Sequence, residues 1–289
     1  APAEFRRGLT RPVNHSKRPG KHRFSGPFSF AGRPALRDSG AMTEPIYAIP
    51  DIHGQRAMLD HALALIEADG GAKARTVFLG DLVDRGPDSR GVIERLLNGI
   101  EQGRDWIVLK GNHDDYVLRF LDHGDAYASK GHPDLPWFDE RLGGGATLAS
   151  YGVDTKGRDL ADILNDARAA IPQAHRDFLA SLPLYHQDSA LLFVHAGIRP
   201  GVALADQTAQ DMMWIREPFL SHPKPHPWLV VHGHTALEAP CHHGNRVNLD
   251  GGAGWGRPLR PAVFEGQDCW LLTETGRVAL CPHSLTDTV

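Results

Sequence analysis

Three short polar stretches, each placed directly after a strand-like run, constrain this chain more than any other feature. They read Asp51-Ile52-His53-Gly54, Gly80-Asp81-Leu82-Val83-Asp84-Arg85-Gly86 and Gly111-Asn112-His113-Asp114. Asp81 follows Asp51 by 30 residues and precedes Asn112 by 31, about the length of one strand–helix–strand unit. Because open α/β sheets place their sites at the carboxyl ends of parallel strands, this spacing predicts a metal centre assembled from successive strand ends.

The bulk composition is that of an ordinary globular protein. The 289 residues are 41% hydrophobic and 23% charged, which leaves room for one large domain or two small ones. The three cysteines form no close pair, which argues against a disulfide framework and a thiolate metal site and favours a reducing compartment. We therefore expect a cytoplasmic protein, and the lack of a long apolar run argues against a membrane partner.

Residues 1–41 differ from the rest of the chain. They hold nine Lys and Arg residues against two acidic ones, are rich in Pro, Gly and Ser, and show no helical or strand periodicity. We expect a disordered basic leader, of upstream or appended origin, with Met42 as the natural start and residues 42–289 as the catalytic domain. An organelle-targeting peptide or a nucleic-acid arm would have a similar composition. The acidic remainder of the chain argues against a nucleic-acid partner.

Strand and helix signals alternate from residue 46 onward. Strands are expected at 46–49, 76–79 and 106–109, with helices at 58–68 and 89–97 between them. The segment 115–188 is predicted to be mostly helical, with helices at 159–170 and 172–182 and a glycine loop at 143–145 that opens a further helix. Strands return at 190–194 and 228–231, and those expected at 246–249, 262–265 and 269–273 are predicted to form an antiparallel edge.

Two of the later strands also end in histidines. His195 follows the strand at 190–194, and His232 and His234 come directly after the strand at 228–231. His232 and His234 would lie on one face of an extended strand, so they compete for a single role. Five strand ends together offer carboxylates, imidazoles and an amide oxygen, the mixed set that suits Mn, Fe or Zn. Asp81 is central in this order and is the natural bridge between two ions.

In these residues the chain resembles the phosphoprotein-phosphatase branch of the calcineurin-like metallophosphoesterases, in its bacterial form. That pattern reads GD-x-HG, GD-x-VDRG, GNH followed by an acid, HAG or HGG, and GHT, and it is matched in order across residues 43–265. The resemblance implies a four-layer α/β/β/α sandwich with a mostly helical insertion that borders the site. Pro50 stands where the family has Gly, which removes one backbone N–H near the first ligand.

The resemblance also implies a role for each motif residue. Asp51 and His53 would bind the first metal, Asp81 would bridge, and Asn112, His195 and His234 would bind the second. His113 would be the general acid, oriented by Asp84, while Arg85, Asn112 and Arg216 would bind the substrate phosphate. His234 takes the ligand role and leaves His232 a supporting one. The cofactors would be two divalent or trivalent ions, with Mn foremost and Fe or Zn as alternatives.

The implied activity is hydrolysis of a phosphomonoester, in which a hydroxide that bridges the metals attacks phosphorus directly. A protein serine/threonine phosphatase is the first expectation, favoured by Val83–Gly86 and His234-Thr235. Its substrate would be a phosphoprotein or a small phosphoester. The alternatives are a symmetrical diadenosine tetraphosphatase or other nucleotidyl hydrolase, a phosphotyrosine-preferring phosphatase, and a catalytically silent scaffold. His195-Ala196-Gly197-Ile198 also suits the tetraphosphatase.

Overall fold

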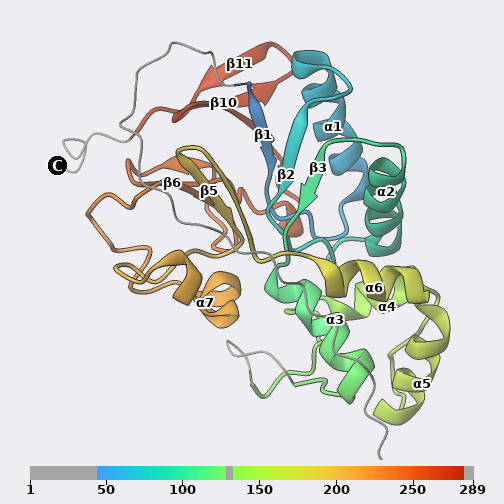
Figure 1. Ribbon diagram of the computed structural model, residues 1–289. Coiled ribbons are helices and arrows are strands. Elements are labelled where there is room, and N and C mark those ends of the chain that lie inside the picture. Colours follow the sequence, from blue (N-terminus) through green and yellow to red (C-terminus); the bar gives the residue numbers. More distant parts are fainter. Residues whose placement is uncertain (1–43, 128–132, 283–289) are drawn as a thin grey trace, which may run out of the picture. The chain divides into compact units, whose positions relative to one another are not determined.

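A computed structural model describes residues 44–127 and 133–282 (Figure 1). All of them belong to one compact unit that spans Met42–Val289, and the leader predicted for residues 1–41 lies outside the described residues. No helix among the described residues is both long and apolar enough to cross a membrane.

The first sheet carries the three opening motifs. Its parallel part consists of β1 (Ile46–Ile49), β2 (Arg75–Phe78) and β3 (Trp106–Val108), joined by helices α1 (Arg56–Gly70) and α2 (Ser89–Glu101). An antiparallel edge is added by β9 (Ala262–Glu265), β10 (Asp268–Thr273) and β11 (Gly276–Ala279), which gives the order β11-β10-β9-β1-β2-β3. Asp88 caps α2 by accepting a hydrogen bond from the Gly91 amide at 2.8 Å.

The second sheet has the order β4-β5-β6-β8-β7. Its strands are β4 (Tyr185–Asp188), β5 (Leu191–Val194), β6 (Leu229–His232), β7 (Cys241–His242) and β8 (Arg246–Asn248). The prediction that residues 246–249 join an antiparallel edge with 262–273 is wrong, because β8 pairs parallel to β6 in this second sheet. All three residues of β8 are buried, which suits an interior parallel strand rather than an exposed edge.

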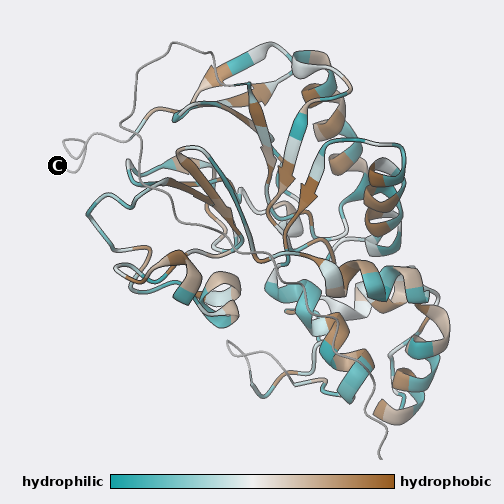
Figure 2. Cartoon of the chain, viewed as in Figure 1, coloured by the Kyte–Doolittle hydropathy of each residue, from teal (hydrophilic) through white to brown (hydrophobic). Residues whose placement is uncertain are grey.

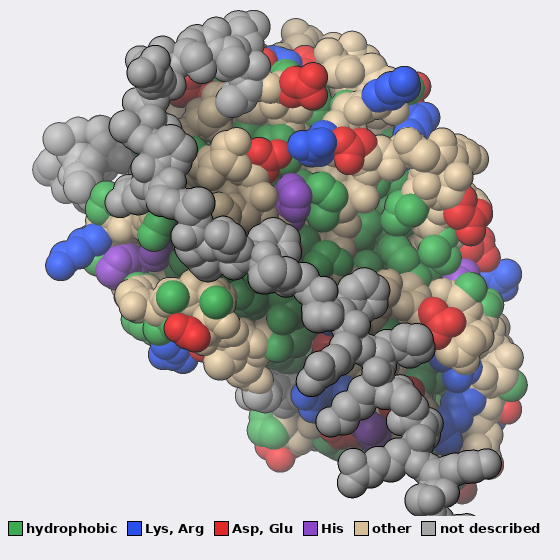
Figure 3. Space-filling model, viewed as in Figure 1, with side chains coloured by type: hydrophobic (Ala, Val, Ile, Leu, Met, Phe, Trp, Pro, Cys, Tyr) green, Lys and Arg blue, Asp and Glu red, His purple; other side chains and the backbone are tan. Residues whose placement is uncertain are grey.

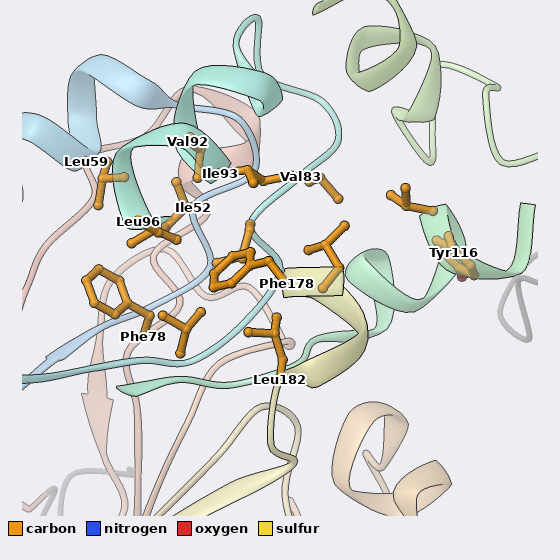
Figure 4. Close-up of a cluster of buried hydrophobic side chains, with 14 of the residues drawn as sticks. Ile52, Leu59, Phe78, Val83, Val92, Ile93, Leu96, Tyr116, Phe178 and Leu182 are labelled. Atoms are coloured by element: carbon orange, nitrogen blue, oxygen red, sulfur yellow. The ribbon is translucent and has the colours of Figure 1, made fainter. Parts of the chain in front are cut away.

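The layers follow from which side chains face which neighbour. Along β1, Ile46 and Ala48 pack with Phe193 and Val247 of the second sheet, while Tyr47 and Ile49 point to α1 and α2. Figure 4 shows Leu59 and Leu96 beside Phe78 in that helix-facing core, to which Val92 also belongs. The outer face of the second sheet packs against α7 (Ala209–Trp214). Apolar residues accordingly line the strands (Figure 2), and the predicted α/β/β/α sandwich is confirmed.

The insertion is mostly helical, as predicted. It contains α3 (Asn112–His123), α4 (Gly144–Ser150), α5 (Leu160–Ala170) and α6 (Gln173–Ser181). Helix α3 begins earlier than expected, so Asn112 and His113 stand in its first turn rather than in a loop. Gly143 precedes α4 in a left-handed conformation, at φ 92°. Short 3-10 turns occur at Leu204–Asp206 and Ala253–Trp255.

The contact between α2 and β3 makes a stability prediction. A Cβ on Gly99 would lie 1.8 Å from the Trp106 ring, so Gly99→Ala must displace the indole. We expect a loss of about 1–3 kcal/mol in the free energy of unfolding, measured by denaturant titration. Asn98→Ala, at an exposed position of the same helix, is the matched control and should be neutral. Equal stability of the two variants would contradict this packing.

Candidate dinuclear metal centre

The structure brings the ends of five strands to one buried place. Asp51 and His53 follow β1, Asp81 follows β2, His195 follows β5, and His234 follows β6, while Asn112 opens α3 just beyond β3. All are buried except His234, which is partly exposed. The crossovers through α1 and α2 put β1, β2 and β3 side by side and parallel, which is why residues distant in sequence meet here.

Asp81 lies at the centre of the cluster. Its Oδ2 is 3.5 Å from His53 Nε2, and its Oδ1 is 3.4 Å from His195 Nε2. Asp81 belongs to two groups of possible ligand atoms, one with His53 and His113 and the other with His195 and His234. Within each group the ligand atoms lie within 4.8 Å of one another. A carboxylate with one oxygen toward each group is the geometry of a bridge between two ions.

The other predicted ligands adjoin this pair of groups. Asn112 Oδ1 lies 3.0 Å from His195 Nε2. The carboxylate of Asp51 accepts hydrogen bonds from the His234 amide at 3.0 and 3.2 Å. His232, the competitor of His234, is fully buried and packs edge-on against Phe219 at 5.0 Å between ring centroids, away from this cluster.

The chemistry of this donor set fits a pair of cations. Burial raises the pKa of Asp51 and of Asp81 well above the usual range, and neighbouring carboxylates raise both further. Burial also lowers the pKa of His195 to about 4 and that of His234 well below its ordinary value. Neutral imidazoles are competent ligands, and a bound cation would offset the cost of ionising the two carboxylates.

The predicted phosphate ligands sit at the edge of the cluster. The Arg85 guanidinium donates from Nη1 to His53 Nε2 at 2.6 Å, and Nη2 lies 3.2 Å from His113 Nε2. Arg216 is exposed. The pKa of His234 is lowered by burial first, and then by the nearby charges of His195 and Arg216. Both arginines therefore lie near the ligands, with Arg85 in direct contact.

The backbone is left-handed at five of the ten predicted site positions. Of the six non-glycine residues with positive φ in the described chain, five are predicted site residues: His53, Asp81, Asp84, Arg85 and His234. Such conformations cost roughly 1–3 kcal/mol each and persist only where the surroundings enforce them. The amides of Ile52 and His53 both donate to the Asp81 carbonyl, at 3.0 and 2.8 Å, so the two turns hold each other.

The predicted acid and its partner form a buried pair. His113 Nδ1 lies 2.6 Å from Asp84 Oδ2, which leaves Nε2 as the ring nitrogen that faces Arg85. Burial raises the pKa of Asp84 to about 7, opposed by hydrogen bonds from Thr147 and Trp137.

Sequence reasoning missed several residues that build the site. Asp114 is fully buried and accepts hydrogen bonds from the amides of Asp81, Leu82 and Gly111 at 2.8–3.0 Å. An acid at the third position of a helix is a capping signal that could have revealed it. Trp137 and Thr147 contact Asp84 from the insertion and carry no such signal.

Comparison with known proteins identifies the family. The model of the calcineurin-like phosphoesterases matches residues 44–259. The chain belongs to this family. It is therefore a phosphoester hydrolase, and the family's fold uses a dinuclear divalent metal centre, for which the Asp81 cluster is the candidate.

Two sequence relatives of this phosphoesterase are named as nucleotide hydrolases. It is 27% identical over 238 residues to the asymmetrical bis(5'-nucleosyl)-tetraphosphatase PrpE of Bacillus subtilis, covering 73% of this chain and 87% of that protein. The PrpE of Bacillus mycoides is 27% identical over 205 residues, which cover 65% of this chain and 74% of the relative.

Solved structures show the same fold. A putative diadenosine tetraphosphatase aligns with a TM-score of 0.57 at 23% identity, covering 80% of this chain and 93% of that one. A cold-active protein-tyrosine phosphatase of a psychrophilic Shewanella also reaches 0.57, at 17% identity and with 82% and 80% of the two chains covered. At these identities the likeness shows the shared fold.

Replacing Asp81 tests the metal centre directly. Asp81→Asn keeps the shape of the side chain but removes the charge, so we expect the chain to retain fewer than the two metal ions that a bridged pair requires. Metal content after gel filtration, measured by elemental analysis, reads this without an activity assay. Asp60→Asn, an exposed change on α1, is the control and should retain the wild-type content. Full retention by Asp81→Asn would contradict the bridging role.

Proposed function

We propose that this phosphoesterase hydrolyses bis(5'-nucleosyl) tetraphosphates. The relatives named above support this substrate class. The observation that carries it is an exposed aromatic side chain, Trp255, held beside the metal cluster. Its indole is 57% exposed, the largest exposed fraction among the large hydrophobic side chains described.

Trp255 is held by contacts between its turn and the site, and its side chain is not packed in the hydrophobic core. It ends the turn Ala253–Trp255 that follows β8, and the Arg85 guanidinium lies over the indole at 4.5 Å from the ring centroid. Gly254 approaches so closely that a Cβ there would lie 2.6 Å from the His53 ring. The indole face opposite Arg85 can stack a nucleobase, an interaction worth about 1–3 kcal/mol in nucleic-acid complexes.

An elongated substrate also has room beyond the phosphate clamp. A groove of about 690 Å³ begins at Arg85 and is bordered by Phe138, Ala149 and Lys156 of the insertion. Arg85 therefore both contacts Trp255 and lines this groove. A base on Trp255, phosphates on Arg85 and the rest of the molecule in the groove describe a dinucleoside polyphosphate.

The residues of the chain then divide the reaction among them. Arg85 and Arg216 bind phosphate oxygens, for which a guanidinium fork is well matched. His113 acts in its doubly protonated form: it gives the Nε2 proton to the departing oxygen and keeps the Nδ1 proton, which Asp84 accepts. The metal pair held by Asp51, His53, Asp81, Asn112, His195 and His234 supplies, when bound, charge neutralisation and activation of water.

Two related activities are alternatives. The sequence pointed to symmetrical cleavage as the nucleotide alternative, whereas PrpE is named as asymmetrical, so we favour release of a nucleoside monophosphate and a nucleoside triphosphate. A protein serine/threonine phosphatase is the second candidate, supported by Val83–Gly86 and His234-Thr235. Figure 3 shows acidic and basic side chains interspersed among the described residues that are visible on this face.

A parallel assay decides among these substrates. The manganese-loaded enzyme is given diadenosine tetraphosphate and matched phosphoserine, phosphothreonine and phosphotyrosine peptides, and kcat/KM is compared. We expect the dinucleotide to be cleaved fastest, with chromatography showing AMP and ATP. Two ADP molecules would indicate symmetrical cleavage, and faster release of phosphate from a peptide would replace the proposal with the second candidate.

A substitution at Trp255 tests the stacking platform. Trp255→Ala should raise KM for diadenosine tetraphosphate by roughly tenfold, since stacking contributes about 1–3 kcal/mol per base. Trp255→Phe should recover most of the affinity. Tyr185→Ala removes another exposed aromatic, on the edge strand β4, and should leave KM at the wild-type value. An unchanged KM in Trp255→Ala would remove the platform from the proposal.

A further inference from the structure

Two side chains of the helical insertion reach the partner of the predicted acid. The Trp137 indole donates from Nε1 to Asp84 Oδ2 at 2.8 Å, and the Thr147 hydroxyl donates to Asp84 Oδ1 at 2.7 Å. Trp137 is 1% exposed, and Thr147 and Asp84 are fully buried. Neither contact belongs to the motifs that mark the site, and they cross 53 and 63 residues of sequence.

Hydrogen bonds hold both the backbone amide and the carboxylate of Asp84. Its amide donates to Thr147 Oγ1 at 2.8 Å, while the single hydroxyl hydrogen of that threonine goes to the Asp84 carboxylate. Ser89 Oγ lies 3.0 Å from Thr147 Oγ1, and must be the donor there, since the threonine hydrogen is already committed. Thr147 thus fixes both the backbone and the side chain of a residue held at φ 75°.

Trp137 and His113 share one oxygen of the same carboxylate. Asp84 Oδ2 accepts from the indole and lies 2.6 Å from His113 Nδ1. Trp137 donates to Oδ2 and Thr147 donates to Oδ1, so two side chains of the insertion set the plane of the carboxylate. The plane in turn sets the direction of the imidazole, and the proton on Nδ1 leaves Nε2 to face Arg85.

We propose that Trp137 and Thr147 are positioning residues, which hold Asp84 so that His113 presents Nε2 to the departing oxygen. This assignment rests on the proposed function, in which His113 is the proton donor. The insertion therefore serves the chemistry as well as access to the site, because it completes the support of the acid. Gly144 belongs to this support, since a Cβ there would lie 2.4 Å from the Trp137 ring.

Variants that remove only the donor groups test the proposal. Trp137→Phe keeps an aromatic ring, and Thr147→Val keeps the shape of the side chain, while Thr147→Ser restores the hydroxyl. Trp270→Phe, in β10 of the first sheet, controls for loss of an indole elsewhere. Thermal unfolding of each variant shows whether it remains folded before its rates are compared.

The decisive readout is how the loss depends on the leaving group. A misplaced acid slows departure of a basic leaving group and spares a weakly basic one. In Trp137→Phe and Thr147→Val we expect kcat for phenyl esters to fall about tenfold, with p-nitrophenyl esters near the wild-type rate and KM unchanged. Both esters are tested as phosphates and as esters of AMP, so the comparison stands even if diadenosine tetraphosphate is not the substrate.

A double variant and a spectroscopic signal complete the test. In an Asp84→Ala background, Trp137→Phe should cause no further loss, because its effect passes through Asp84. For the neutral ring, the ¹⁵N spectrum of His113 should show the proton on Nδ1 in the wild type and shared between Nδ1 and Nε2 in the Trp137→Phe, Thr147→Val double variant. Equal slowing of both ester classes, a further loss in the Asp84→Ala background, or an unchanged tautomer would overturn the proposal.

Discussion

The mutual support of the turns after β1 and β2 is the constraint on which the rest of the site depends. Each turn contains left-handed residues that an isolated loop would not keep. The Asp81 carbonyl accepts two amides from the first turn, and the His53 carbonyl accepts the Gly86 amide of the second at 2.9 Å. His53 and Asp81 therefore face each other because their backbones are tied together, before any metal is considered.

Asp114 extends this support to the third strand. Its carboxylate accepts amides from both sides, Asp81 and Leu82 after β2 and Gly111 after β3. Gly80 and Gly111 must be glycine for this approach, since a Cβ on Gly80 would lie 2.5 Å from the Gly111 nitrogen. The close packing also explains the electrostatics, because it excludes water from carboxylates that a cation must then stabilise.

Local signals in the sequence were sufficient to predict the strands that carry the candidate ligands. They were insufficient to predict the strands and side chains that surround those ligands. Asp51, Asp81 and His195 follow short apolar strands, so their convergence could be inferred from chain order and the handedness of crossovers. The placement of β8 was wrong because a short strand does not reveal its partner, and burial of all three residues appears only in the fold. Trp137 and Thr147 were missed for a similar reason, since a hydrogen bond across the insertion leaves no periodic trace.

The support of the acid and the binding of the nucleobase answer different chemical demands. Departure of an alkoxide, as from phosphoserine, needs proton assistance more than departure of a weakly basic phosphoanhydride does. The buried His113–Asp84 pair would therefore favour esters on chemical grounds alone. A preference for dinucleoside tetraphosphates must then come from binding energy, and the exposed Trp255 beside Arg85 is the described feature placed to supply it. On the proposed function, selectivity among phosphate compounds would depend on the turn at Ala253–Trp255, while the insertion would maintain the acid that any of these substrates can use.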